Sequence, residues 1–304
     1  MLQKFDSIPF ERLKVYYKKY DSDIHDLNLT NLSIWHKKHD LHVLEIENYI
    51  WYVYNPDDPF NMKFSEPVGD YSNVEGLKSA TDQWISYCLE HNYPLSLRHI
   101  GESYKAFLVE YDYNFDSVPV MDDFDYCYIT EELANLSGNK FHKKKNHLNQ
   151  FSKHHLDRFR IETIGTNNAD SAFTAAKNWC ISNGCGDTLD LCFEFNGIQQ
   201  ILSTWEIYQN RGIEGTVIYV DDLPVAFTFG EFISNDTFLV HIEKADQSVM
   251  GIYTAINHAM ANQVKDRCLY LNREQDMGIE GIRKAKQSYH PHHLVSKYDV
   301  LVLS

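Results

Sequence analysis

Several features common in secreted and membrane proteins are missing from this sequence. No apolar run approaches the roughly 18 residues needed to span a bilayer, and residues 1–6 lack the apolar core of a signal peptide. Glycine and proline are sparse, at 14 and 8 of 304 residues, and no segment is of low complexity. The sequence therefore predicts an ordered cytoplasmic protein without a transmembrane segment.

The sequence also lacks the motifs of several enzyme classes. It has no G-x-S-x-G nucleophile elbow, no P-loop and no H-E-x-x-H zinc motif. Cys180 and Cys185 lie five positions apart rather than in the C-x2-C pair of a zinc site, so no metal site is expected. The cysteines, which we expect to be reduced, are Cys88, Cys127, Cys180, Cys185, Cys192 and Cys268.

Acidic residues outnumber basic ones by 43 to 28, which gives a net charge of −15. A uniformly acidic surface repels nucleic acid and anionic lipid. Residues 138–160 are the exception, because seven Lys or Arg accompany one Asp there, for a local charge of 7 − 1 = +6. On a helix, Lys143, Lys144 and His147 fall within about 60° of Lys140. This basic face indicates either a nucleic-acid or other anionic partner, or simply a solvated helix surface.

The length suits two domains of about 150 residues. In the second half, apolar periodicity and turn signals predict helices at 171–181, 197–208, 249–263 and 279–289, and strands at 216–220, 225–232, 237–244, 268–271 and 300–303. This is the element order of an acetyltransferase-like fold. The first half is interpreted as a degenerate copy of the same fold. Its predicted helices are at 10–20 and 74–89, and its predicted strands are at 43–46, 49–54, 95–98 and 105–109. We expect domains at 1–160 and 161–304.

Long motifs carry a family resemblance that spans nearly the whole chain. They are PVG (67–69), DFDYCY (123–128), GNKFHKKKNHLN (138–149), HIEKAD (241–246) and the segment 269–291, which begins LYLNREQDMG. The sequence resembles a bacterial family related to the cytosolic catalytic domain of phosphatidylglycerol lysyltransferases. The resemblance implies an α/β protein of two tandem GNAT-like acyltransferase domains, with a cleft in the C-terminal one.

The expected strand 237–244 carries two candidate bases. Period-two alternation places His241 and Glu243 on one face and Lys244 on the other. Glu243 is the preferred general base and His241 the second choice, with backbone N–H groups of the strand holding an oxyanion. An ordinary solvated sheet face is the alternative.

The segment 269–291 places charge at the end of a short apolar strand, where α/β domains bind ligands. Its cations suit a phosphate or carboxylate, and Tyr289 suits protonation of a leaving group. The predicted substrate-binding residues are Lys244, Asn272, Arg273, Gln275, Arg283 and Lys286. Salt bridges to Glu274, Asp276 and Glu280 would instead make these cations structural.

The predicted donor and acceptor of the transferred group rest on the family resemblance rather than on a motif. The turn 246–253 departs from the acetyltransferase pattern [Q/R]-x-x-G-x-[G/A], since Met250 and Tyr253 replace small residues. The sequence therefore identifies no cofactor. CoA stays possible, although the motif that binds its pyrophosphate is absent. The resemblance implies an aminoacyl-tRNA donor and an amine or hydroxyl acceptor, either a small molecule or a peripheral lipid. The alternatives are an acyl-CoA-dependent N-acyltransferase and a non-catalytic small-molecule-binding module.

Overall fold

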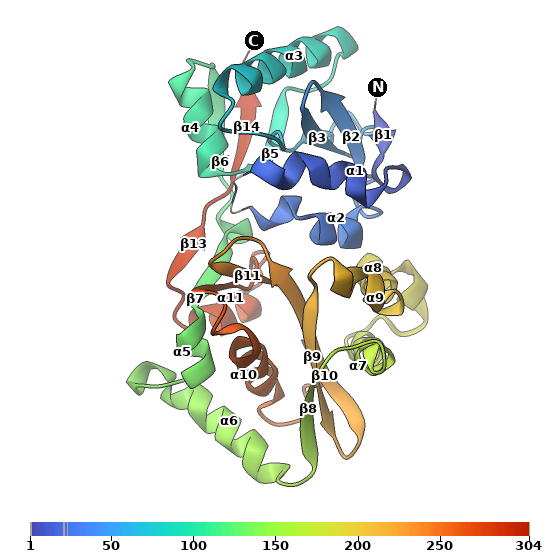
Figure 1. Cartoon of the computed structure of the whole chain (residues 1–304), viewed down its shortest axis with the longest axis vertical. Helices are drawn as coiled ribbons and strands as arrows, with labels where there is room; N and C mark the ends of the chain where they lie inside the picture. The colour runs from blue at the N-terminus through green and yellow to red at the C-terminus, as the bar shows by residue number, and fades with distance from the viewer. Residues whose placement is uncertain (1, 21, 23, 304) are drawn as a thin grey trace. The chain divides into compact units, whose positions relative to one another are not determined.

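The computed structural model describes residues 2–20, 22 and 24–303, apart from the side chains of residues 186 and 187. It is a mixed α/β structure with two seven-stranded sheets (Figure 1). Contacts divide the chain into two compact units, Met1–Phe124 with Val295–Ser304, and Asp125–Leu294. In the part that the structure describes, no helix has the length and apolar character to cross a membrane.

The sheet of the first unit has the strand order β1-β2-β3-β4-β5-β14-β6. These strands are β1 (Gln3–Lys4), β2 (His42–Ile46), β3 (Tyr49–Tyr54), β4 (Lys63–Phe64), β5 (Ser96–Ile100), β6 (Phe115–Pro119) and β14 (Tyr298–Val302). The α-helices are α1 (Phe10–Lys14), α2 (Leu29–Trp35), α3 (Val74–His91) and α4 (Glu102–Glu110), and short 3-10 turns include Val15–Lys19 and His25–Leu27.

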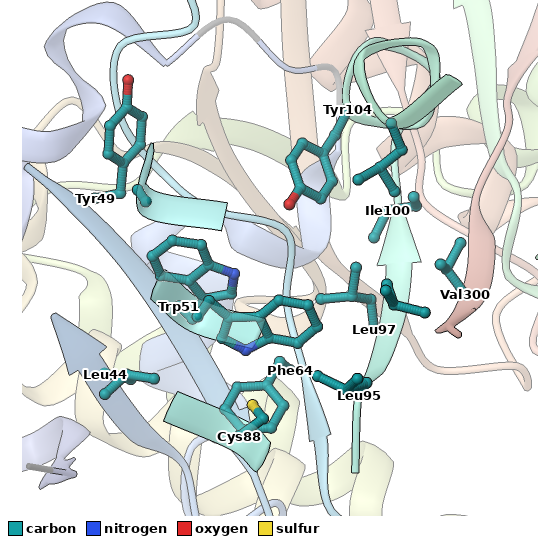
Figure 2. Close-up of a cluster of buried hydrophobic side chains, with 14 of the residues drawn as sticks. Leu44, Tyr49, Trp51, Phe64, Cys88, Leu95, Leu97, Ile100, Tyr104 and Val300 are labelled. Atoms are coloured by element: carbon teal, nitrogen blue, oxygen red, sulfur yellow. The ribbon is translucent and has the colours of Figure 1, made fainter. Parts of the chain in front are cut away.

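The core of the first unit is built from large aromatic and aliphatic side chains. Trp84 of α3 stacks on Trp51 of β3, with ring centroids 6.4 Å apart and planes at 5°, and Phe64 meets Trp84 edge-on. Figure 2 shows Leu97 of β5 beside Val300 of β14 in the same cluster. The last strand is therefore held in this sheet by burial of its apolar face.

The second sheet has the order β13-β7-β12-β11-β10-β9-β8. Its strands are β7 (Asp125–Ile129), β8 (Phe159–Thr163), β9 (Glu214–Val220), β10 (Leu223–Phe232), β11 (Thr237–Ala245), β12 (Tyr270–Asn272) and β13 (His293–Val295). The α-helices are α5 (Thr130–Asn135), α6 (His142–His154), α7 (Ala169–Ser182), α8 (Phe193–Ser203), α9 (Trp205–Asn210), α10 (Ile252–Val264) and α11 (Glu280–Gln287). Helices α7 and α10 cover opposite faces of strands β9 to β11 (Figure 1).

Two sequence-based assignments in the first unit need correction. Residues 105–109, expected as a strand, belong to α4. Tyr104, Phe107 and Leu108 are buried there, and their i, i+3, i+4 spacing is that of one helix face. The predicted helix 10–20 is helical, but it changes from α-helix to 3-10 helix at Val15.

The second unit begins at Asp125 and ends at Leu294, whereas the sequence led us to expect a boundary after residue 160. Strand β7 pairs with β12, and α5 and α6 pack against α10, so residues 125–160 belong to the second unit. The final strand, expected to end the second domain, lies between β5 and β6 of the first sheet. Strands β7 and β14 each pair with strands that are distant in the sequence. The local sequence pattern cannot predict such pairing.

Candidate functional site

Strand β11 contains a β-bulge at His241. Phe229 of β10 pairs with Ile242, and the next residue, Gly230, pairs with Val240, so His241 is the extra residue. A bulge interrupts the alternation of side chains. Glu243 consequently contacts Asn257 of α10, whereas His241 lies near the Phe229 ring on the other face. The prediction that His241 and Glu243 share a face is wrong.

Gly230 permits this bulge. A Cβ on Gly230 would lie 1.9 Å from the carbonyl oxygen of Leu239 and 2.7 Å from the ring of Phe238. No side chain fits at that approach, because the nearest obstacle is backbone. The bulge and its glycine therefore set the direction in which Glu243 points.

Glu243 forms a mostly buried ion pair with Arg273. Their side chains are each 12% exposed, and Glu243 Oε1 lies 2.7 Å from an Arg273 guanidinium nitrogen. Strand β12 pairs in parallel with β11 only as far as Leu239 and Asn272. The pair therefore sits beyond the end of β12, at the carboxyl ends of two neighbouring parallel strands, where α/β sheets bind ligands.

Aromatic rings and a lysine surround this pair. The Arg273 guanidinium lies 5.0 Å from the Tyr289 ring centroid and 5.8 Å from that of Tyr128. Lys144 Nζ, from α6, lies 3.8 Å from the Tyr289 ring. Burial and the charge of Arg273 lower the pKa of Lys144 to about 8, against the opposing effect of Glu243. Lys144, Glu243, Arg273 and Tyr289 thus form one cluster, which we call the Glu243 site.

Two polar atoms beside the carboxylate are buried without a hydrogen-bond partner among the described residues. They are Arg273 Nη1 and Asn257 Oδ1, and the amide nitrogen of Asn257 lies 3.4 Å from Glu243 Oε2. Gln275 Oε1 is likewise buried without a hydrogen-bond partner among the described residues. Burying such atoms unpaired is costly, so they point to a bound polar group.

The Tyr289 hydroxyl is buried and lies 3.4 Å from Thr254 Oγ1. Burial raises the pKa of Tyr289, although the charge of Arg273 opposes this effect. The phenol therefore holds its proton at neutral pH, a state compatible with the predicted role of proton donor.

His241 lies between two carboxylates. Its Nε2 is 3.0 Å from Glu231 Oε1, and its Nδ1 is 3.7 Å from Glu274 Oε1. Burial alone would lower the pKa of His241, but these carboxylates outweigh it and raise the pKa to about 9. A side chain that is already protonated at neutral pH is a poor proton acceptor. The geometry favours a structural role for His241 over that of a base.

This arrangement predicts loss of stability in alkali. The pKa of His241 rises from 6.5 to about 9 on folding, so its stabilisation is complete below pH 6.5 and disappears as the pH rises through 9. The shift corresponds to about 3 kcal/mol. Burial and the charge of Arg273 lower the pKa of Lys286 to about 8, as they do that of Lys144, so both lysines also titrate in this range. The measurement is therefore the difference in unfolding free energy between wild type and His241→Gln. We expect it to fall by that amount between about pH 6 and about pH 10; a constant difference contradicts the assignment.

Four of the predicted substrate-binding residues are engaged within the fold. Lys286 Nζ donates to the carbonyl oxygens of Arg273, Glu274 and Gln275, and Arg283 pairs with both carboxylate oxygens of Asp276. Asn272 donates to Asp125 and accepts from the Glu274 N–H, and Lys244 pairs with Glu194 of α8. These four side chains hold the loop after β12 in place and tie β11 to α8. Of the predicted substrate-binding residues, Arg273 and Gln275 remain as candidates.

The four residues of the predicted basic face have different surroundings in the structure. Lys140, in the 3-10 turn Asn139–Phe141 before α6, is exposed and pairs with Glu132. Lys143 and His147 are exposed on α6 itself. Lys144 is less exposed and contacts the Tyr289 ring. The helix also lies against the start of α10, since a Cβ on Gly251 would meet the His147 carbonyl oxygen at 2.4 Å. Helix α6 therefore packs against Gly251, within the turn 246–253.

The first unit contains a polar pocket of about 460 Å³, whose lining includes Lys63, Arg98 and His99. Lys63 pairs with Asp299, and His99 bridges Asp26 and Asp123. None of the site residues predicted from the sequence lines this pocket.

Sequence reasoning missed Asn257 and a cysteine cluster. Asn257 is a buried polar residue within the apolar face of the helix predicted at 249–263, and that position was the available signal. Cys180, Cys185 and Cys192 come together in space, although their spacing matches no common zinc motif.

Comparison with known proteins identifies the family. The family described as phosphatidylglycerol lysyltransferase, C-terminal, matches residues 17–301. The chain belongs to this family. A conserved protein of unknown function from Bacteroides thetaiotaomicron VPI-5482 superposes with a TM-score of 0.84 at 28% identity, over 96% of both chains.

Two more distant relatives match in structure or in sequence. The C-terminal domain of a putative lysylphosphatidylglycerol synthetase from Agrobacterium fabrum has a TM-score of 0.68 at 13% identity, over 96% of this chain and 90% of that one. An uncharacterised protein of Mycoplasmoides gallisepticum is 24% identical over 185 residues, which are 59% of this chain but only 56% of that protein. The prediction of two tandem GNAT-like units in an α/β protein is confirmed, and family membership places the chain among transferase domains.

Proposed function

We propose that this chain transfers an acyl or aminoacyl group from an aminoacyl-tRNA to an amine or hydroxyl acceptor, at the Glu243 site. The observation that carries the proposal is the pair of buried atoms to which no described residue is bonded, Arg273 Nη1 and Asn257 Oδ1. The guanidinium nitrogen can only donate a hydrogen bond and the amide oxygen can only accept one. Together with the Glu243 carboxylate they suit a reaction that brings an N–H or O–H nucleophile to a carbonyl.

In the proposed reaction, Asn257 Oδ1 orients the acceptor and Glu243 takes its proton as the acceptor attacks the ester carbonyl carbon. Negative charge develops on the carbonyl oxygen, where Arg273 Nη1 donates a hydrogen bond. The bond to the donor ribose oxygen breaks, and Tyr289 gives that oxygen a proton. The Tyr289 phenolate regains a proton through solvent as Glu243 releases the one it accepted.

Helix α6 supports a tRNA donor rather than CoA. The His147 carbonyl packs directly against Gly251, and the Ile252 and Thr254 N–H groups donate to the carbonyls of Val249 and Gly251, which leaves fewer N–H groups at the start of α10 for a pyrophosphate. Lys143 and His147 are exposed on α6, and Lys144 reaches the site from it. We propose that these side chains contact donor phosphates, which makes donor binding weaken as salt is raised.

The test uses bulk tRNA charged with a labelled amino-acid mixture, with labelled acetyl-CoA in a parallel reaction and a mixed pool of amines and lipids as acceptor. We expect the chain to move label from tRNA to an acceptor faster than spontaneous ester hydrolysis. Consumption of acetyl-CoA alone would place the chain with acyl-CoA-dependent N-acyltransferases. Binding of donor or acceptor without turnover would make it a binding module.

A further inference from the structure

We propose that Cys180, Cys185 and Cys192 form a binding site for a thiophilic d10 metal ion, Cu⁺ or Zn²⁺, in the second unit. The three sulfur atoms all lie within 4.8 Å of one another. Metal–sulfur bonds of about 2.3 Å place bound sulfurs about 4 Å apart. Closing the site therefore requires each thiol to move by less than about 1 Å.

The end of α7 brings the first two thiols together. The Cys185 N–H donates to the Cys180 carbonyl at 3.0 Å, and the Gly184 N–H donates to the Ile181 carbonyl at 3.4 Å. With Gly184 at a φ of +94°, these are the two bonds of a Schellman motif, which juxtaposes the side chains at its first and last positions. Those positions usually carry apolar residues, and here they carry cysteines.

The start of α8 brings the third thiol. Cys192 is the N-cap residue of α8, and the Asn196 N–H donates to its carbonyl at 3.0 Å. A helix N-terminus favours negative charge, which suits a thiolate ligand. The cluster thus rests on two helix ends with regular hydrogen bonding, so the geometry is built into the backbone.

The chemistry of the ligand set selects the kind of ion. The group that meets the distance condition among the described residues contains thiols and no His or carboxylate, and soft thiolate ligands select Cu⁺ or Zn²⁺ over Mg²⁺, Ca²⁺ or Mn²⁺. Cys180 is buried while Cys185 and Cys192 are partly exposed, so an ion has a route in from solvent. Binding releases the thiol protons and leaves the sulfurs as thiolates.

The test titrates the reduced, full-length protein with Zn²⁺ alone and with Cu⁺ alone against a chromogenic chelator. We expect one ion per chain. Cys180→Ser, Cys185→Ser and Cys192→Ser should each weaken binding by at least ~10–100-fold, the range seen when even an outer-shell partner of a metal is lost. Cys268→Ser removes a thiol outside the cluster and should bind as wild type does.

A second measurement needs no variant. Alkylation of Cys185 and Cys192 in the wild-type protein, followed by peptide mapping, should slow when the ion is added. The proposal is overturned if neither ion binds the reduced protein, if binding survives in all three variants, or if alkylation is unchanged by the ion. A Cys185–Cys192 disulfide in protein isolated without reductant, together with no binding after reduction, would assign the cluster to redox chemistry instead.

Discussion

Replacement of Glu243 by Gln is expected to lower the rate of group transfer by about 10²–10⁴-fold, the usual contribution of a general base. The amide has nearly the shape of the carboxylate, so it can still accept a hydrogen bond from Arg273, 2.7 Å away in the wild type. It cannot accept the proton of the attacking amine or hydroxyl. The expected loss is therefore in the maximal rate, with a smaller change in the affinity for donor.

The control for this substitution is Glu280→Gln. Glu280 is 80% exposed and pairs with Lys284 one turn along α11, and exposed pairs of this kind contribute little, so activity should be unchanged. Removing one member of the buried pair with Arg273 also destabilises the fold. Thermal unfolding and circular dichroism of Glu243→Gln must therefore accompany the kinetics. A folded Glu243→Gln protein with wild-type activity would exclude the proposed role.

Replacement of Gly230 by Val is expected to destabilise the second unit by about 3 kcal/mol, the upper end of the usual cost of overpacking, and to lower transfer activity along with it. A Cβ at this position would lie 1.9 Å from the Leu239 carbonyl oxygen, so β10 and β11 must move apart. That movement disturbs the bulge at His241 and with it the direction of Glu243. Urea unfolding gives the free energy, and the transfer assay on the remaining folded protein gives the activity.

Gly281→Ala is the matched control for Gly230→Val. Gly281 lies in α11, and among the described residues no atom beyond its chain neighbours and its own helix backbone comes within 4 Å of a Cβ placed on it. Alanine is a better helix former there, so the change should be neutral or stabilise by about 0.4–1 kcal/mol. If Gly230→Val unfolds at the same urea concentration as wild type, the bulge does not depend on this glycine.

The candidate site was only partly visible in the sequence. Arg273 was predicted because charge near the end of a strand in an α/β chain marks a ligand site. Tyr289 was predicted from the same segment as a proton donor, and Glu243 from the alternation of side chains along the strand 237–244. Arg283 and Lys286 looked equivalent to Arg273 in the sequence, but Arg283 pairs with Asp276 and Lys286 bonds three carbonyl oxygens. Which cations remain available depends on partners that only the folded chain brings near.

Local patterns in the sequence were sufficient to determine the α/β class and to place α3, α7, α10, α11 and strands β9 to β12, because apolar periodicity reflects which face each element buries. Strands β8 and β13, helices α2 and α5, and the break between α8 and α9 were not predicted. Tertiary structure alone decided the bulge at His241, the pairing of β14 with β5 and the gathering of Cys180, Cys185 and Cys192. Each of these requires a partner strand or a second helix end whose position the local pattern does not record. The direction of Glu243 belongs with them, because a single extra residue in β11 reverses which face a side chain occupies.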